Sequence, residues 1–276
     1  MANAPTKPTT PVKESSSASG MFAVLTIPIC LIVGILIFFF ILGNPSHYAG
    51  GDVENGNPTD LFGTVHKGGP IVPVILSFVI MVIVFSIERA IVIGKAAGTG
   101  NVDAFVRKIT GLLNAGNIDA ASAECDKQKG SVANVIKSGL KKYREMETED
   151  SLTIEQKTLA IQKDIEEATS LEMPMLEQNL TIIATLVSIG TLSGLLGTVV
   201  GMIGAFATLS ASGAPNTSEL SAHISEALIN TALGISTSAS SIILYNYFTS
   251  KIDKLTYAID ETGFSIVQTF AASHRK

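Results

Sequence analysis

The chain has 276 residues, of which 46% are hydrophobic and only 16% are charged. An ordinary soluble domain carries roughly 25% charged residues, so this composition indicates extensive lipid-facing surface. The net charge of -5 offers no basic face of the kind that binds nucleic acid. The two cysteines, Cys30 and Cys125, lie far apart without a neighbouring His or Cys at ligand spacing, which argues against a disulfide framework and a zinc site.

Residues 1–20 are rich in Pro, Thr and Ser and too poor in apolar residues to offset the entropy of ordering, so a disordered tail is expected. Beyond the tail, a helix that crosses a bilayer needs about 20 mostly apolar residues. Four segments satisfy this requirement: residues 21–43, 71–94, 179–209 and 224–248. The first is longer than the roughly 7 to 15 apolar residues of a signal peptide, which favours a retained anchor. The sequence predicts an all-α membrane protein with four transmembrane helices.

Two loops connect these spans on one side. Residues 44–70 are dense in Gly, Asn, Pro and Asp, which favour turns, so an irregular loop is expected there, and residues 210–223 form a shorter one. Lys and Arg are concentrated elsewhere: eleven lie in residues 95–178 and four after residue 248, against one in the first loop and none in the second. Because cytoplasmic segments carry the excess of Lys and Arg, both loops are predicted to be periplasmic and both termini cytoplasmic.

Residues 95–178 predict a cytoplasmic helical domain, because their apolar residues recur at helical spacing. The predicted helices cover residues 102–113, 118–127 and 132–146. From residue 151 onward the helical pattern runs without a break into the third span, with a kink expected at Pro174. The fourth span should likewise extend into a C-terminal cytoplasmic helix, residues 249–276.

The third and fourth spans carry many Ser, Thr and Gly residues, which contact with lipid does not require. One interpretation is that small residues only let helices approach closely and hydrogen-bond to each other. Four glycines three or four residues apart share one flank of the third span and are predicted to form such a helix interface: Gly194, Gly197, Gly201 and Gly204.

Glu226 is the leading candidate for chemistry within a span. An ionisable side chain in a membrane is costly and usually faces a partner or a wet cavity. The alternative is positional, since Glu226 lies only a few residues into the fourth span and could sit among lipid headgroups. Glu88 and Arg89, at the end of the second span, are expected to anchor that helix at the membrane interface, and no chemistry is assigned to them.

Two stretches resemble a known family. Residues 194–202 (GLLGTVVGM) are similar to the Gly-Leu-Leu-Gly-Thr-Val-x-Gly-Ile/Met motif of ExbB and TolQ. Residues 224–234 (ISEALINTALG) are similar to the Ile-x-Glu-Ala-Leu-x-x-Thr-Ala-x-Gly motif of the same proteins. Two matched motifs at the right separation are specific, and the resemblance to the MotA/TolQ/ExbB proton channel family covers about residues 68–248.

This resemblance implies a homo-oligomeric ring, a pentamer, around two copies of an ExbD-like single-span protein whose transmembrane Asp carries protons. Thr198 and Thr231 match threonines that line the pore of the family, and Glu226 matches a glutamate near the outer mouth, so these three residues form the expected proton pathway. The implied function is that of an ExbB-like subunit in an inner-membrane motor that energises TonB-dependent outer-membrane transport. A TonB-like protein is the further expected partner. Residues 21–43 are an addition, because the family commonly has three spans.

Other functions stay open. Within the same class, the chain could be a TolQ-like subunit or a flagellar or gliding stator subunit. A secondary transporter is less favoured, because neither repeated halves nor broken spans are evident. An enzyme is not expected, since the sequence shows no pairing of nucleophile and base and no phosphate loop. Neither a cofactor nor a metal is predicted.

Overall fold

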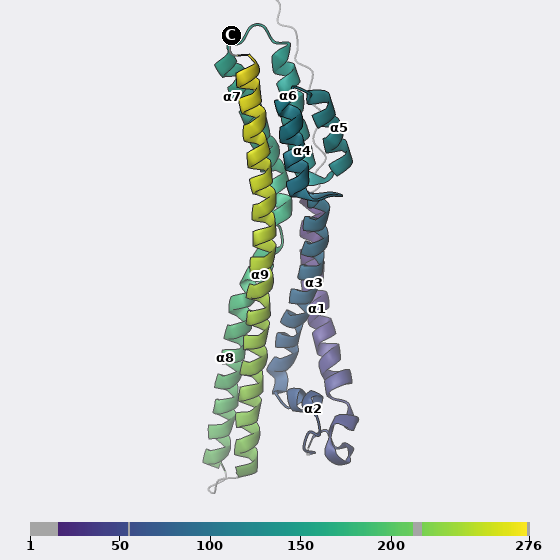
Figure 1. Cartoon of the computed structure of the whole chain (residues 1–276). Coiled ribbons are helices and arrows are strands. Elements are labelled where there is room, and N and C mark those ends of the chain that lie inside the picture. Colours follow the sequence, from purple (N-terminus) through teal and green to yellow (C-terminus); the bar gives the residue numbers. More distant parts are fainter. Residues whose placement is uncertain (1–15, 55, 212–216, 275–276) are drawn as a thin grey trace, which may run out of the picture.

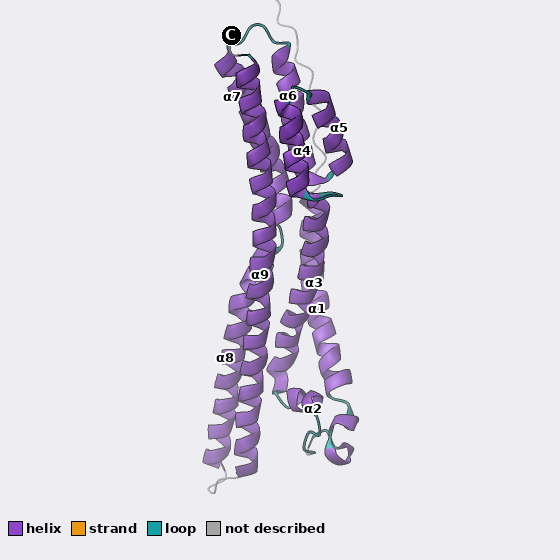
Figure 2. Ribbon diagram, viewed as in Figure 1, coloured by secondary structure: helices purple, strands orange, loops and turns teal. Residues whose placement is uncertain are grey.

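The computed structural model describes residues 16–54, 56–211 and 217–274, and nearly all of them are helical. The long helices run roughly along one axis, so the molecule is a slender rod (Figure 1). Figure 2 shows how little of this rod is loop. Of the tail predicted to be disordered, residues 1–15 lie outside the described part of the chain. Residues 16–20 are helical, because the first helix begins at Ser16.

Within the described residues, four helical stretches are long and apolar enough to cross a membrane, as the sequence predicts. They pair within the rod: α8 lies beside α9, and α1 lies beside α3 (Figure 1). Their bounds are Ser16–Leu36 for α1, which continues as the π-helical segment η1 (Ile37–Leu42), Val72–Ala97 for α3, Leu180–Ala211 for α8 and Thr217–Ser273 for α9.

Four further helices lie at one end of the rod, where three of them pack against the C-terminal half of α9 and the fourth, α5, packs on α4 and α6 (Figure 1). They are α4 (Val102–Asn114), α5 (Ile118–Gln128), α6 (Gly130–Glu147) and α7 (Ile154–Glu177). Side-chain caps set several of their starts, because the first N–H groups of a helix have no partner within it. Asn101 and Asn117 cap α4 and α5, and Thr153 forms a capping box with Gln156 at α7. Apolar side chains from these helices and α9 are almost fully buried between them: Ile109, Leu113, Ile136, Leu140, Ile161 and Ile259.

The first loop is more ordered than the irregular segment predicted for residues 44–70. It contains three short 3-10 helices and one α-helical turn: η2 (Pro45–His47), η3 (Ala49–Gly51), α2 (Leu61–His66) and η4 (Gly69–Ile71). Asp60 caps α2 by accepting a hydrogen bond from the Gly63 N–H at 2.9 Å. The Tyr48 hydroxyl lies 2.6 Å from His66 Nδ1 and ties the two ends of the loop together. Residues that favour turns also serve as helix caps, so composition alone does not separate the two outcomes.

The prediction of one continuous helix from residue 151 through the third span is wrong. Helix α7 ends at Glu177, and Asn179 adopts a left-handed conformation (φ 61°) before α8 begins. Pro174 stays inside α7, where its carbonyl accepts a hydrogen bond from the Gln178 N–H at 3.0 Å. Asn is among the few residues that tolerate the left-handed region, so the break falls at Asn179 rather than at the proline.

Arg89 joins α3 to the end of α7. Its side chain is only 1% exposed, which contradicts the expected role as a headgroup anchor. The guanidinium binds the carboxylate of Glu88, and Nη1 donates to the carbonyls of Met175 and Leu176 at 3.2 and 3.0 Å. The last carbonyls of a helix lack partners and carry partial negative charge, so a cation satisfies them. Arg89 thereby stabilises the α7 terminus just before the break at Asn179.

The second loop is shorter than predicted. Helix α9 begins at Thr217, so residues 217–223 of the predicted loop 210–223 are helical, and residues 212–216 lie outside the described ranges. From Thr217, α9 runs for 57 residues to Ser273 without interruption. The expected continuation of the fourth span into a C-terminal helix therefore agrees with the structure.

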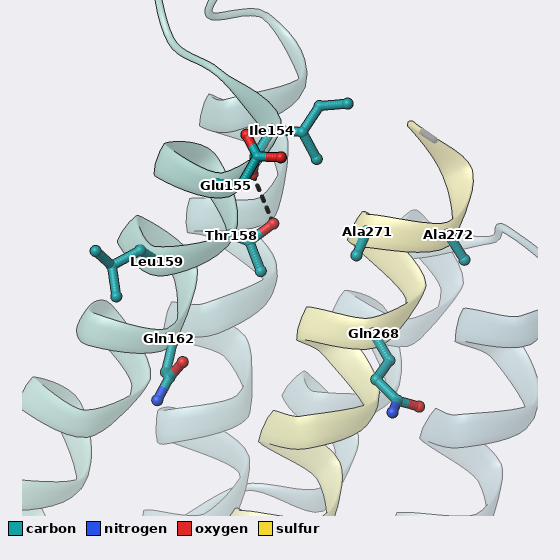
Figure 3. Close-up of a pocket in the computed structure, with 8 residues that line it drawn as sticks. All are labelled: Ile154, Glu155, Thr158, Leu159, Gln162, Gln268, Ala271 and Ala272. Carbon is teal, nitrogen blue, oxygen red and sulfur yellow. Dashed lines mark hydrogen bonds between the residues drawn. The ribbon is translucent and has the colours of Figure 1, made fainter. Parts of the chain in front are cut away.

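A groove separates the start of α7 from the end of α9 (Figure 3). Gln162 and Gln268 extend from its two sides, and the Thr158 hydroxyl donates a hydrogen bond to the Ile154 carbonyl at 2.7 Å. The other lining residues are small, apolar or acidic: Leu159, Glu155, Ala271 and Ala272. None of the residues predicted for the proton pathway lines this groove, so it does not serve as the candidate site.

Candidate functional site

The glycine flank of α8 packs against α9 of the same chain. A Cβ atom on Gly194 would lie 3.1 Å from Gly234 Cα, and one on Gly201 would lie 2.9 Å from Ala227 Cβ. A Cβ on Gly197 would overlap the side chain of Asn230. Because each of these positions has no room for a side chain, the glycines set how closely the two helices approach. Gly204, the outermost of the four, faces the ring of His223.

Hydroxyl groups bridge the same helix pair farther along. Thr191 Oγ1 donates to Ser238 Oγ at 2.8 Å, and Ser238 Oγ donates to the Val187 carbonyl at 2.6 Å. A Cβ on Gly190 would lie 2.8 Å from Ser238 Oγ, so the bridge also needs a glycine beside it. Interhelical hydrogen bonds of this kind fix the rotation of one helix relative to its neighbour.

Thr198 and Thr231 both belong to this pair but bind different groups. Thr231 Oγ1 lies 3.3 Å from the Gly194 carbonyl on α8 and 3.2 Å from the Ala227 carbonyl on its own helix. Thr198 Oγ1 donates to the Leu195 carbonyl one turn earlier, at 2.6 Å. Both side chains are half-buried. Each hydroxyl donates to backbone and keeps lone pairs that can accept from water or a partner.

Glu226 occupies the junction of α9 with the turn before α3. Its carboxylate fills the space that a side chain on Gly69 would need, and Gly69 has the positive φ of 78° that glycine adopts without strain. The carboxylate Oε2 lies 3.5 Å from Nδ1 of His223. The Glu226 side chain is 19% exposed. It is therefore held between protein groups, with part of its surface open.

Asn230 is a residue of this site that the sequence analysis did not single out. It is fully buried, and its Nδ2 donates to the Gly68 carbonyl at 2.7 Å. Its Oδ1 is buried without a protein partner. Asn230 thus ties α9 to the Gly68-Gly69 turn one helical turn beyond Glu226. The available signal was a polar amide in an apolar stretch at the i+4 position from Glu226.

A third group of hydroxyls lies on the open flank of the α8–α9 pair. Thr185 and Ser188 on α8 and Ser236 and Ser240 on α9 are exposed in the single chain. Large apolar side chains share the exposed surface of α8: Leu192, Leu195, Leu196 and Val199. A surface that alternates hydroxyls with large apolar groups suits contact with other helices and with water more than with lipid alone.

The part of the chain that contains this helix pair is similar to a known protein family. The model of the MotA/TolQ/ExbB proton channel family matches residues 127–261, a stretch that contains both sequence motifs. An ExbB protein of Aquifex aeolicus is 40% identical over 77 residues, which is 28% of this chain and 52% of that protein. An ExbB-like 3 biopolymer transport protein of Synechocystis sp. is 34% identical over 88 residues, 31% of this chain and 42% of that protein.

A Tol-Pal system protein, TolQ of Pseudomonas aeruginosa, is 23% identical over 154 residues, 56% of this chain and 67% of that protein. The chain spans about half the length of the ExbB relatives that it matches. The described residues contain four helices that can cross a membrane, and the α8–α9 pair carries both motifs within the stretch, just under half of the chain, that is similar to the MotA/TolQ/ExbB proton channel family.

Proposed function

We propose that this chain is an ExbB-like scaffold subunit of an inner-membrane motor that uses the proton motive force to energise TonB-dependent outer-membrane transport. The observation that carries the proposal is the α8–α9 pair, in which Thr198, Thr231 and Glu226 lie on two helices that glycines hold in contact. The family model matches residues 127–261, which include the motifs of both helices, and two relatives named ExbB or ExbB-like are 40% and 34% identical over 77 and 88 residues.

In this proposal, copies of the chain assemble as a pentameric ring. The exposed hydroxyls of α8 and α9 face the lumen, and the large apolar side chains of α8 contact neighbouring copies and lipid. An ExbD-like single-span protein occupies the lumen, and its transmembrane Asp exchanges protons with water held by the threonine hydroxyls. A hydroxyl can both donate and accept, so it supports such water without adding a fixed charge. A TonB-like protein takes up the resulting motion.

The proposed topology places both termini and the α4–α7 helices in the cytoplasm, with residues 44–68 and the α8–α9 connection in the periplasm. This orientation rests on the distribution of Lys and Arg. A membrane-impermeant thiol reagent should label a cysteine introduced at Asn57 and spare one introduced at Ser131. Labelling of Ser131→Cys in intact cells would overturn the orientation.

A Tol-Pal role is the second candidate, because the TolQ relative matches over 154 residues, a longer stretch than the 88 and 77 residues of the ExbB-like and ExbB relatives. The two roles differ in the single-span protein that assembles with the chain. Identification of the co-purifying protein by mass spectrometry separates them, since an ExbD-like partner supports the first role and a TolR-like partner the second.

The proton pathway is tested with Thr198→Val and Thr231→Val, singly and together. Valine nearly keeps the volume of threonine and removes the hydroxyl, so the ring should still assemble while growth on a TonB-dependent nutrient falls. Thr256→Val is the matched control, because Thr256 lies on the same helix as Thr231 and makes the same bond to the carbonyl four residues earlier, at 3.1 Å. Membrane levels and partner co-purification are measured for each variant. Uptake by the double variant at the level of Thr256→Val would refute the pathway.

A further inference from the structure

His223 and Glu226 form a pair on one face of α9, three residues apart. Nδ1 of the imidazole lies 3.5 Å from Oε2 of the carboxylate. The His223 side chain is 32% exposed and that of Glu226 is 19% exposed, so both are partly enclosed and both reach solvent. The polar atoms of the two side chains therefore face each other across one turn of the helix.

The fold provides a glycine for each member of the pair, and these glycines come from two different elements. On α8, a Cβ at Gly204 would lie 2.7 Å from Nδ1 and 2.8 Å from Cε1 of His223. Before α3, a Cβ at Gly69 would overlap Oε1 of Glu226. Real Cβ atoms do not approach so closely, so any other residue at either position would displace the pair. The arrangement therefore depends on three separate parts of the chain.

Asn230 holds the Gly68-Gly69 turn in place. Its Nδ2 donates to the Gly68 carbonyl at 2.7 Å, which fixes the turn that carries Gly69 against Glu226. Asn230 is fully buried, so this hydrogen bond is shielded from water. A buried, shielded bond of this kind resists rearrangement, and Glu226 keeps its orientation toward His223.

Few other charges face the pair. Helix α8 contains no ionisable residue between Leu180 and Ala211, and the stretch from Gly68 to Ile87 contains none either. Lys67 precedes the turn, but its Nζ donates to the carbonyls of Val53 and Glu54 at 3.0 and 2.8 Å. On α9 itself, Glu219 lies two turns before Glu226 and is exposed. His66, which also precedes the turn, stacks on the Phe38 ring. Residues 68–87 and 180–211 therefore place no charged side chain against the pair.

We propose that His223 is a second proton-binding residue of the pathway and exchanges a proton with Glu226. This inference rests on the proposed function and extends it. An imidazole nitrogen can both accept and release a proton, so His223 can take a proton from water outside the membrane and pass it on. The imidazolium then loses its Nδ1 proton and the carboxylate gains it, with no other bond formed or broken. Transfer requires the two atoms to approach from 3.5 Å to about 2.8 Å, which side-chain rotation supplies.

The first test measures proton flux through the full chain, purified with its single-span partner and reconstituted in vesicles, while the pH on the outer side is varied. His223→Gln keeps a hydrogen-bonding side chain of similar length that does not titrate in this range. We expect this variant to lower the flux and to lose the change in flux between about pH 5 and pH 8 that an imidazole confers. His274→Gln is the matched control, because His274 stacks on Phe270 at the opposite end of α9.

A double variant shows whether the two residues act together. If His223 and Glu226 form one unit, His223→Gln combined with Glu226→Gln should reduce the flux no further than the more severe single variant. Losses that multiply would overturn the proposal, and so would a His223→Gln variant that keeps the pH profile of the unmodified chain.

A spectroscopic test does not depend on flux. In the purified chain with ¹⁵N-labelled histidine, Glu226→Gln should change the ring nitrogen signals of His223 at neutral pH, and Glu219→Gln should leave them in place. Unchanged signals in Glu226→Gln would refute the pair even if His223→Gln assembles poorly. Absence of flux in the unmodified complex, with the His223 signals responding as expected, would instead count against the proposed function and leave the pair standing.

Discussion

The two helix pairs of the rod are built on different contacts. In the α8–α9 pair, glycine meets glycine: a Cβ on Gly234 would lie 2.7 Å from Gly194 Cα. The α1–α3 pair has one close approach, where a Cβ on Gly34 would lie 2.8 Å from the Pro73 carbonyl. Elsewhere α1 buries the small side chains of Thr26 and Cys30, and its Phe22 ring packs edge to face on Phe85 of α3, with the ring centroids 6.1 Å apart.

The α8–α9 pair is therefore the restricted pair, whose helix arrangement is closely determined, and the α1–α3 pair is the tolerant pair. Close backbone approach and cross-helix hydroxyl bonds allow one arrangement of α8 and α9, as a fixed set of polar groups requires. Apolar contacts such as the Phe22–Phe85 pair can repack with little change in free energy, so α1 and α3 are joined with less geometric restriction away from Gly34. The more restricted pair is also the one that contains Thr198, Thr231 and Glu226.

The largest expected effect comes from Arg89, which joins α3 of the α1–α3 pair to the end of α7, the helix that precedes α8. Arg89→Leu leaves the Glu88 carboxylate and two helix-terminal carbonyls without their partner, and loss of one member of a buried ion pair costs about 3–5 kcal/mol. Equilibrium unfolding in mixed micelles measures this loss. Arg107→Leu, at an exposed position on α4, is the control and should change stability by no more than about 0.5 kcal/mol. Equal stability of the two variants would contradict the role of Arg89.

The next effect concerns the restricted pair. Gly197→Leu places a side chain where Asn230 lies, so α8 and α9 must separate, and overpacking of this kind costs about 1–3 kcal/mol. Gly94→Leu is the matched control, because no atom lies within 4 Å of a Cβ at Gly94. Native mass spectrometry and unfolding of both variants check the outcome. An intact assembly for Gly197→Leu with the stability of Gly94→Leu would show that the α8–α9 contact is not restrictive.

A smaller effect is expected in the tolerant pair. Gly34→Leu should push α1 away from α3 while leaving α8 and α9 together, because α1 packs mainly along α3. The accessibility of the Cys30 thiol reports the separation of α1 from α3, since Cys30 lies one turn from Gly34 and is only 2% exposed. N-ethylmaleimide in the membrane should label Cys30 faster in the variant. Burial raises the pKa of the other thiol, Cys125, to about 12, so its background reaction near pH 7 is slow. Unchanged labelling of Cys30 would show that α1 accommodates the substitution without separating.

The smallest effect is a pH dependence at the outer end of the α1–α3 pair. Burial, with Lys67 nearby, lowers the pKa of His66 below its usual value of 6.5, so the folded loop favours the neutral imidazole against the Phe38 ring. Because the unfolded loop binds the proton more readily, this contribution to stability is present above pH 6.5 and is lost as the pH falls through the folded-state pKa. Hydrogen exchange of residues 44–68, corrected for intrinsic rates, should quicken on acidification. His66→Gln should remove the change in that range. Exchange that is independent of pH in the unmodified chain would contradict it.

The spans and most helices could be predicted from the sequence, because hydropathy and apolar spacing report directly on lipid contact and helix faces. The break at Asn179 could not, since Pro174 is the stronger breaking signal and the chain keeps it inside α7. His223 was assigned to a loop, which hid its position on one helix face with Glu226. The carbonyl partners of Arg89 lie more than 80 residues away in the sequence, at the end of α7, and no local pattern indicates them.

The break at Asn179 gives α9 and the α7–α8 segment beside it different mechanical properties. Helix α9 is one stiff shaft of 57 residues, about 85 Å at 1.5 Å per residue. Beside it, α7 and α8 form two links with a joint between them. A twist applied to the outer end of α9 therefore reaches its far end, because no joint along the shaft absorbs it. Because α8 is held in one arrangement against α9, the two helices move together, and the joint at Asn179 can take up the difference between α8 and α7, which Arg89 holds to α3.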